Sequence, residues 1–444
     1  MLGTLWLAIL PCIAFVKGLD VTINMQNGQG DTGIRVLTFP ADRCLGWLSR
    51  RLYDGDGQDW AWDPIGRAQG TLTVSRKDQL GLFLDREEAH DLSPLTDFPS
   101  DTLHTIHGLG TTLNDQGLAH IAHLKALCSL DCTHTTVGNE GASYLSRLDS
   151  LEDLSIGQTL VTDRGLSFLR RSIQLQELCL HDTHISDAGL AYLQHLDQLR
   201  VLDLMKTGVG DAGVAHLNGL ASLTVLLLNE TGVGDDGLDA LRNLTTVNSL
   251  HLWKTRVTDR GVASLRNMTR LRHLDLTDTA ITGSGLAHLQ GLSDLTTLVL
   301  HTTAVDDASV AFLVNFPSLQ ELYMSSTRVG DVGLAHLAHL STLRHLDLAR
   351  TSVTDAGLAS LARLPQLREL DLSDTQVSNG GLSSLQEITT LRVLRLNNTL
   401  VDDKGLQALA PLTLLQELWV VGSMVSEQGI AALRHTLPRC HVYT

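Results

Sequence analysis

Aromatic side chains and runs of basic residues are both scarce in this chain. Aromatic residues make up only 4% of the 444 residues, which is typical of a core built from small aliphatic side chains rather than from large rings. No lysine- or arginine-rich run occurs, and the net charge is −16. Because nucleic-acid binding normally requires a basic stripe, the sequence predicts no nucleic-acid partner.

The cysteines do not form the pattern of a disulfide framework. There are six of them, at Cys12, Cys44, Cys128, Cys132, Cys179 and Cys440. Only Cys128 and Cys132 lie close together in sequence, whereas small disulfide-rich domains carry many closely spaced cysteines. The fold must therefore be stabilised by a buried apolar core.

No apolar run is long enough to cross a membrane reliably. The apolar segment 2–16 is shorter than the roughly 20 residues of a spanning helix, so no stable membrane span is expected. No Lys or Arg precedes the segment and no A-x-A site follows it, so it matches a signal peptide only in part. We interpret residues 1–18 as a possible signal-like segment; a buried strand or a misassigned start are the alternatives. Export to the periplasm or secretion would follow from a signal peptide, and a cytoplasmic location otherwise.

What the chain does contain is a threonine at every 24th position over most of its length. The series is Thr111, Thr135, Thr159, Thr183, Thr207, Thr231, Thr255, Thr279, Thr303, Thr327, Thr351, Thr375 and Thr399, followed by Ser423. A fixed period in the twenties indicates a solenoid, in which each repeat packs only on its neighbours.

Each repeat combines a short strand with a helical turn. In Leu346-Asp-Leu348 the apolar residues alternate with a period of two, which is typical of a strand. In Gly357-Leu358-Ala-Ser-Leu361 the apolar spacing changes to three, which indicates a helical turn. Strands stack about 4.8 Å apart whereas helices need roughly 8–10 Å. The solenoid must therefore curve, with its strands on the concave side.

Three recurring small or polar positions carry structural predictions. The repeated threonine should be buried at the end of the strand, with its hydroxyl bonded to backbone groups. The aspartate before each helical turn, such as Asp355, suits an N-cap. The glycine column, interrupted only by Ser309, allows a close backbone approach at the start of the helix.

The repeated frame L-x-x-L-x-L-x-x-T-x-V-x-D-x-G-L-x-x-L-x-x-L resembles the leucine-rich repeat family, with Thr where many members carry Asn or Cys. It is most similar to the T-x-V-T-D-x-G-L repeats of bacterial proteins and to the repeats of F-box substrate receptors. The resemblance implies an α/β solenoid over residues 103–444, with about 14 repeats of 24 residues and a terminal strand. It also implies a curved horseshoe with a parallel concave sheet and convex helices.

Residues 19–95 follow a different pattern. From Ile34 to Leu84, short apolar runs alternate with Gly/Asp loops, which indicates a small β-rich module. Terminal repeats need a polar cap. We therefore expect this module to cover the apolar end of the first repeat.

No pattern supports catalysis or a cofactor. The motifs G-x-x-x-x-G-K-S/T, H-E-x-x-H and G-x-S-x-G are absent, and the repeats leave no room for a catalytic domain. The sequence therefore predicts a protein that is not an enzyme and uses no cofactor.

Two possible metal motifs also have simpler explanations. The segment Asp54-Gly-Asp56-Gly-Gln-Asp59 resembles the start of a calcium loop, but Ile65 stands where a bidentate Glu is needed. A solvated turn explains it better. Four histidines share one helical position but belong to different repeats, which favours a solvated outer face over a metal site. They are His120, His216, His288 and His336.

The candidate binding site lies on the inner strand face in the middle of the array. Apolar and aromatic residues replace polar ones there, at Met205, Val225, Leu227, His251, Trp253, Val299, His301 and Tyr323, with Val201 alongside. An exposed patch of this kind marks a binding site more often than not. The alternative is that these side chains pack against one another. Acidic residues flank the patch, so a protein or peptide with an apolar centre and a basic rim would suit it.

Two functions remain open at this point. The first is a bacterial-type interaction scaffold that binds a protein or peptide on its concave face. The second, suggested by the resemblance, is the substrate-recognition subunit of an SCF-type ubiquitin ligase. That alternative requires an N-terminal helical F-box of about forty residues, whereas Gly-rich, β-like sequence follows Phe39-Pro-Ala-Asp-Arg-Cys-Leu.

Overall fold

The computed structural model describes residues 33–52 and 61–444. They form two compact units: unit 1 contains residues up to 185 together with 195–203, and unit 2 contains 186–194 and 204–444. The apolar segment 1–18 and the loop 54–59 lie outside the described residues. The signal-like and solvated-turn interpretations therefore remain predictions.

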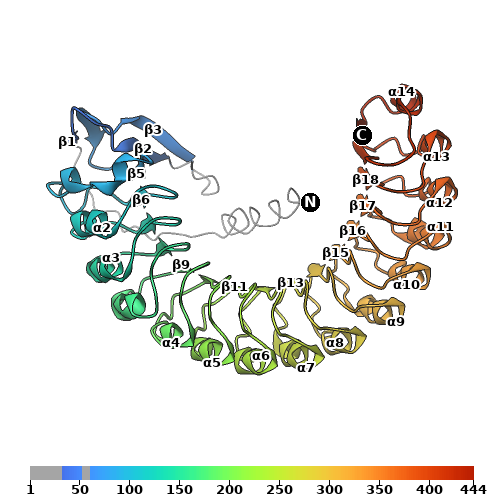
Figure 1. The fold of residues 1–444 in the computed structure, drawn as a ribbon, viewed down its shortest axis with the longest axis horizontal. Coiled ribbons are helices and arrows are strands. Elements are labelled where there is room, and N and C mark those ends of the chain that lie inside the picture. The colour runs from blue at the N-terminus through green and yellow to red at the C-terminus, as the bar shows by residue number, and fades with distance from the viewer. Residues whose placement is uncertain (1–32, 53–60) are drawn as a thin grey trace. The chain divides into compact units, whose positions relative to one another are not determined.

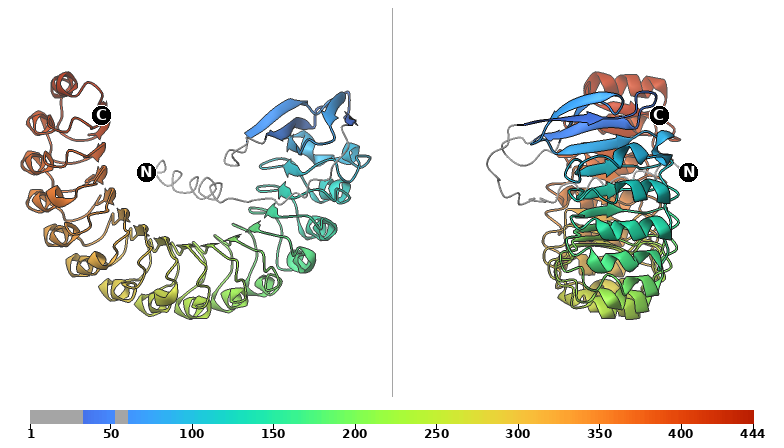
Figure 2. Two further views of the ribbon diagram at one scale, coloured as in Figure 1. Left: turned by 180° about the vertical axis from the view of Figure 1, so that it is seen from behind. Right: turned by 90° about the vertical axis from the view of Figure 1, so that its left-hand side faces the viewer.

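The described residues of unit 1 up to 84 contain five strands, as expected of a β-rich module. They are β1 Ile34–Thr38, β2 Gly46–Leu52, β3 Ala61–Arg67, β4 Thr71–Ser75 and β5 Leu80–Leu84. β1 pairs with β4, and β2 lies between β3 and β5, all antiparallel. β5 then pairs in parallel with β6 (Thr105–His107). Figure 2 shows these strands in blue beside the first repeats.

The remainder of unit 1 consists of 24-residue coils, each with a three-residue strand and a helical segment. The further strands are β7 Ser129–Asp131, β8 Asp153–Ser155, β9 Glu177–Cys179 and β10 Val201–Asp203, all parallel. The helical segments are η1 Glu88–His90, η2 Ser93–Leu95, α2 Asp115–Ile121, α3 Asn139–Tyr144, η3 Leu145–Arg147 and η4 Gly165–Arg171. Each strand lies in register with the same positions of the next coil.

Unit 2 continues the pattern through ten parallel strands. They are β11 Val225–Leu227, β12 Ser249–His251, β13 His273–Asp275, β14 Thr297–Val299, β15 Glu321–Tyr323, β16 His345–Asp347, β17 Glu369–Asp371, β18 Val393–Arg395, β19 Glu417–Trp419 and β20 His441–Tyr443. The central residue of each strand from β11 to β19, such as Leu250, is buried, whereas Val442 of β20 is half-buried. The predicted α/β repeat with a parallel sheet is confirmed.

The helical segments of unit 2 lie on the side opposite its strands (Figure 1). They are α4 Asp187–Leu190, α5 Asp211–Val214, η5 Ala215–Leu217, α6 Asp235–Leu241, α7 Asp259–Val262, η6 Ala263–Asn267, α8 Gly283–His288, α9 Asp307–Val310, η7 Ala311–Asn315, α10 Asp331–Leu337, α11 Asp355–Leu358, η8 Ala359–Arg363, α12 Asn379–Leu385, α13 Asp403–Gln407 and α14 Glu427–Thr436. Within this unit the strands line the concave side and the helices the convex side.

The threonine column closes the turn after each strand, as predicted. Thr255 is 8% exposed, and its Oγ1 donates a hydrogen bond to the carbonyl oxygen of Leu252 at 2.7 Å. The same bond to the residue three positions earlier recurs in all thirteen threonines from Thr111 to Thr399. Each hydroxyl therefore satisfies a backbone acceptor where the chain turns into the core.

The residue before each threonine has a left-handed backbone, which the sequence did not reveal. The φ angle is 55° at Lys254, and the two coils nearest the ends of the series have glycine instead, at Gly110 and Gly422. A non-glycine residue in this region costs roughly 1–2 kcal/mol. At Lys254, for example, the backbone N–H donates to the Thr277 carbonyl and the next N–H to the Leu252 carbonyl, which helps to offset that cost.

The N-cap role predicted for the repeated aspartate is wrong. Asp235 is the first residue of α6, and the N-cap position is already occupied by Gly234. The Oδ1 atom of Asp235 accepts a hydrogen bond from the backbone N–H of Thr258 in the next coil at 2.8 Å, and Oδ2 accepts one from the Thr258 hydroxyl at 2.7 Å. The aspartate therefore links consecutive coils. The same backbone bond is made by Asp115, Asp187, Asp211, Asp259, Asp307, Asp331, Asp355 and Asp403.

These aspartates explain why glycine recurs two residues into each helix. A Cβ atom at Gly261 would lie 2.4 Å from Oδ1 of Asp235 and 2.9 Å from its Cα. One coil lacks the glycine, and the preceding coil lacks the aspartate. Ser309 replaces the glycine where the preceding coil carries Gly283 in place of the aspartate, and a Cβ atom at Gly283 would lie 2.5 Å from Oγ of Ser309.

We expect Thr255→Val to lower the free energy of unfolding by about 1–3 kcal/mol. Valine keeps the shape of the side chain but cannot donate to the Leu252 carbonyl, which is buried with it. Chemical denaturation measures the effect, and Thr245→Val at an exposed position should change the stability by less than about 0.5 kcal/mol. Equal stabilities of both variants and the native chain would show that the threonine column contributes nothing.

Candidate functional site

The inner strand face of unit 2 places five of the predicted residues on nearby coils. His251 ends β12, Val299 ends β14 and Tyr323 ends β15. Trp253 and His301 each lie two residues beyond a strand. All five side chains are half-buried. We call them the inner patch.

The exposure predicted for three other residues is wrong. Met205 is 9% exposed, Val225 7% and Leu227 4%. Parallel strands lie only about 4.8 Å apart, so side chains on a concave face pack on their neighbours; Leu227, for example, stands opposite His251 in the ladder. Val201, in unit 1, is buried as well. These side chains therefore pack against their neighbours and do not form an exposed binding surface.

Histidine and tyrosine rings contact one another along this face. His301 and Tyr323 are edge-to-face at 5.7 Å between ring centroids. His251 stacks on His273 at 4.5 Å, and Tyr323 lies 4.5 Å from His345. His273 and His345 were missed because each stands at the first position of its strand. The alternation along each strand could have identified them, because it places the first and third residues of a strand on the same face.

The histidines at the centre of the face are neutral at neutral pH. Burial lowers the pKa of His251 to about 3, with a smaller effect from the neighbouring His273. Burial likewise lowers the pKa of His273 to about 4. The Oγ atom of Ser249 lies 3.0 Å from Nε2 of His251, whereas Nε2 of His273 is buried without a partner among the described residues. The two imidazole rings are therefore uncharged, and the Asp275 carboxyl stands beside them, opposite both His251 and Val299 in the ladder.

Acidification should destabilise unit 2 through these two histidines. Their folded-state pKa values lie below the unfolded value of about 6.5, so the unfolded chain binds more protons between those values. The stability is complete above pH 6.5 and is lost as the pH falls toward 4. Two carboxyl groups oppose this trend: Asp347, with its pKa raised to about 6 by burial and by Asp371, and Asp275, whose pKa burial also raises. We expect a net loss of about 2 kcal/mol between pH 6.5 and 4.5.

Urea denaturation across this pH range measures the loss. His273→Gln should flatten the dependence, because it removes one titrating imidazole and leaves an uncharged amide. The interpretation fails if the native chain and the variant lose stability equally.

One end of the inner face carries an excess of carboxylates. Asp347 and Asp371 stand opposite each other in the ladder. Glu369 is the partly neutralised member, because His345 Nδ1 lies 3.1 Å and Arg395 3.9 Å from its carboxylate. Burial, with Asp371 opposite, raises the pKa of Asp347, and Arg395 stands opposite Asp371 on the next strand.

Trp253 is the largest member of the inner patch. Its backbone N–H donates to Oδ1 of Asn229 at 2.9 Å, and its carbonyl accepts from the N–H of Glu230. The backbone of this turn is therefore fixed. Within the part of the chain that the structure describes, the indole N–H has no hydrogen-bond partner.

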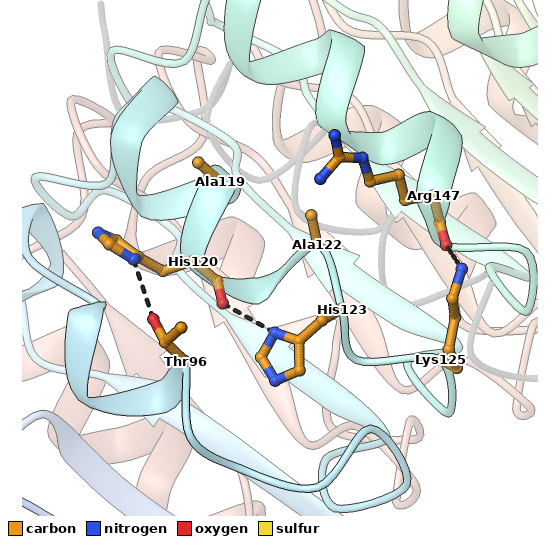
Figure 3. Close-up of a pocket in the computed structure, with 7 residues that line it drawn as sticks. All are labelled: Thr96, Ala119, His120, Ala122, His123, Lys125 and Arg147. Carbon is orange, nitrogen blue, oxygen red and sulfur yellow. Dashed lines mark hydrogen bonds between the residues drawn. The ribbon is translucent and has the colours of Figure 1, made fainter.

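Unit 1 has a shallow depression of about 440 Å³ beside α2, lined by Thr96, Ala119, His120, Ala122, His123, Lys125 and Arg147 (Figure 3). The side chains of Thr96, His120, His123 and Lys125 already have hydrogen-bond partners. Nε2 of His123 lies 2.8 Å from the Phe98 carbonyl, and Nδ1 of His120 lies 3.0 Å from the Thr96 hydroxyl. The Lys125 ammonium donates to the Arg147 carbonyl. Since these groups bind one another, the depression is not a prepared ligand site.

The column of four histidines on the helical side does not converge. His216 and His288 are exposed and belong to separate coils. Among the described residues, one group of metal-ligating side chains does come together, formed by Cys179, His181 and Asp203 in unit 1. The group is not evident in the sequence, because its members come from two coils. The repeat length could have indicated it, because residues 24 apart, such as Cys179 and Asp203, stand opposite each other in the ladder.

Within the described ranges, no helix is both long and apolar enough to span a membrane.

Comparisons with known proteins identify the repeats. A family model described as "Leucine-rich repeat region" matches residues 145–382, and one described as "Leucine Rich repeat" matches 387–410. No curated protein matches this chain. No family with a catalytic activity is among the matches.

Several solved structures are similar to this chain. An internalin from Listeria monocytogenes is 25% identical, with 67% of this chain and 82% of its own length covered and a TM-score of 0.57. A leucine-rich repeat protein from Leptospira interrogans is 17% identical, covering 81% of this chain and 100% of its own, with a TM-score of 0.57. A TDR receptor is 15% identical; the match covers 78% of this chain and 58% of the receptor chain, with a TM-score of 0.51. The similarity to the last two structures shows only a shared fold.

Proposed function

Because the chain belongs to the leucine-rich repeat family, we propose that it is a non-catalytic binding protein whose inner patch holds a protein or peptide. Leucine-rich repeat proteins generally mediate protein–protein interactions. The side chains on the inner face of unit 2 support this function.

The observation that carries the proposal is the state of Trp253. Its backbone is fixed by Asn229 and Glu230, while its ring is half-buried beside the inner face and its indole N–H has no partner among the described residues. A large amphipathic ring of this kind gains most when a partner desolvates it and accepts its hydrogen bond.

The surroundings of Trp253 indicate the chemistry of the partner. The neutral rings of His251, His301 and Tyr323 favour apolar or aromatic side chains. The carboxylates of Asp347 and Asp371 favour a Lys or Arg beyond them, since a cation there would relieve the repulsion between them. A peptide with an apolar centre and basic residues at one end fits both features.

The ubiquitin-ligase alternative gains no support. An F-box is helical, whereas strands β1, β2 and β3 occupy the described residues on either side of Phe39-Pro-Ala-Asp-Arg-Cys-Leu. The interaction scaffold remains the better proposal.

Selection from a random peptide library tests the proposal, because it samples many candidate partners at once. The full chain should enrich peptides that combine aromatic or aliphatic residues with Lys or Arg. Isothermal titration would then give the affinity of a selected peptide.

Trp253→Ala should weaken the binding of such a peptide by about 30-fold, which corresponds to about 2 kcal/mol. Its thermal unfolding should change little, because the ring is not part of the buried core. Trp419→Ala is the matched control: this ring also lies on the inner face of unit 2, but it stacks on Tyr443 at 3.9 Å. If Trp253→Ala lowers the stability sharply and leaves the affinity unchanged, the ring is packing and the proposed site is wrong.

A further inference from the structure

Three side chains with metal-binding atoms meet on the inner face of unit 1. Cys179 ends β9 and Asp203 ends β10, and the two are paired in the parallel ladder. His181 follows two residues after Cys179, where the chain turns. The Cys179 Sγ and His181 Nδ1 atoms are 2.8 Å apart, His181 Nδ1 and Asp203 Oδ2 are 3.4 Å apart, and Sγ and Oδ2 are 3.5 Å apart.

The geometry is that of a chelating group and not that of a catalytic triad. In a triad, the nucleophile and the orienting carboxylate bond to opposite nitrogens of the imidazole. Here Cys179 and Asp203 both approach Nδ1 of His181. All three ligand atoms therefore face one common point, and no proton relay runs through the ring.

The distances suit a small tetrahedral ion. With Zn–S near 2.3 Å and Zn–N and Zn–O near 2.0–2.2 Å, ligand atoms of a tetrahedral site lie roughly 3.3–3.6 Å apart. Two of the three distances already have this value, and the Cys179–His181 distance would lengthen by roughly 0.7 Å on binding. The side chains of His181 and Asp203 are 20% and 15% exposed, so an ion can reach them from solvent.

Two further carboxyl groups lie on neighbouring strands, where Asp153 stands opposite Glu177 in the ladder. Burial, with Asp153 nearby, raises the pKa of Glu177 to about 7. Burial also raises the pKa of Asp153 to about 6, against a hydrogen bond from Ser129, and Asp131 adds to that rise. Burial therefore leaves these carboxyl groups partly protonated near neutral pH, and it is the contacts among Cys179, His181 and Asp203 that favour an ion.

We propose that Cys179, His181 and Asp203 bind a divalent transition-metal ion of the zinc class, with water as the fourth ligand. The sulfur and imidazole ligands select such an ion over Mg²⁺ or Ca²⁺, which prefer oxygen. The thiol is available, because Cys179 is not in a disulfide. It loses its proton to solvent when the ion binds.

Cobalt(II) titration of the reduced, metal-free full chain tests the site directly. We expect a thiolate-to-cobalt charge-transfer band in the near ultraviolet, visible absorption typical of a four-coordinate ion, saturation at one equivalent, and displacement by Zn²⁺. Cys179→Ser should abolish the charge-transfer band. His181→Asn and Asp203→Asn, which keep the thiol, should each weaken binding at least tenfold.

Cys128→Ser provides the matched control. Cys128 is another half-buried free cysteine of unit 1, and its replacement should leave the titration unchanged. Circular dichroism checks that each variant is folded. The proposal is overturned if no charge-transfer band forms, if the band survives Cys179→Ser, or if folded His181→Asn binds the ion as tightly as the native chain.

Discussion

Replacing Gly283 with asparagine should destabilise unit 2 by about 3 kcal/mol, and a second replacement, Ser309→Gly, should recover most of that loss. The first change places a Cβ atom 2.5 Å from the Ser309 hydroxyl oxygen, 3.0 Å from Cβ of Ser309 and 3.1 Å from its Cα. Backbone atoms cannot move aside cheaply, and overpacking of this kind costs about 1–3 kcal/mol or more. The second change removes the obstacle and recreates the glycine of the other coils.

Asparagine is the right choice because the chain already contains the same arrangement elsewhere. Oδ1 of Asn379 accepts from the backbone N–H of Asp402 at 3.0 Å, and Nδ2 of Asn379 donates to the Asp402 carboxylate at 2.8 Å. Asp306 holds the corresponding N-cap position after Gly283. Gly283→Asp would instead place two carboxylates together, so Gly283→Asp/Ser309→Gly should recover less stability than the asparagine pair.

Urea denaturation of the native chain, the two single variants and the double variant provides the four stabilities of a double-mutant cycle. Ser309→Gly alone should cost about 1 kcal/mol, because it removes the capping box between Ser309 and Asp306. The coupling energy between the two sites should be favourable by about 2–3 kcal/mol. Additive effects would show that the glycine–serine exchange is coincidental.

The repeat itself was predictable from sequence because its causes are local. The threonine at the end of each strand bonds to a carbonyl only three residues earlier, so its role follows from one coil. The aspartate was misassigned because its partner is 23 residues away in the next coil. A single repeat cannot distinguish an acceptor for its own helix from an acceptor for its neighbour.

The same limit applies to the candidate sites. Alternation along a strand correctly indicated which face Leu227 occupies, but its burial depends on residues of adjacent coils such as His251. Cys179 and Asp203 look unrelated in sequence and become neighbours only when the coils are stacked in register. Properties that depend on the spacing between coils therefore required the structure.

Deleting residues 1–95 should remove the cap of the first coil and cause the largest loss of stability of the changes considered. β5 supplies the strand beside β6, and Leu82 within it is fully buried. Leu92 and Leu95 are fully buried as well, and Leu92 faces Gly117 of α2, where the later coils use an aspartate. Without these residues, the edge of β6 and the apolar end of the first coil would meet water.

The truncated chain should self-associate, and its first coils should unfold locally. Each large aliphatic side chain uncovered costs about 1.5–3 kcal/mol, so the loss around Ile106 and Leu118 should exceed about 4 kcal/mol. Hydrogen exchange should accelerate in residues 103–160 and remain slow in 340–400, because each coil packs only on its neighbours. Deleting residues 1–32 alone is the control, since every contact described for residues 33–95 is retained. If the chain lacking 1–95 stays monomeric with native exchange in its first coils, then residues 33–95 are not a cap, and the strands β1–β5 serve some purpose other than protecting the solenoid.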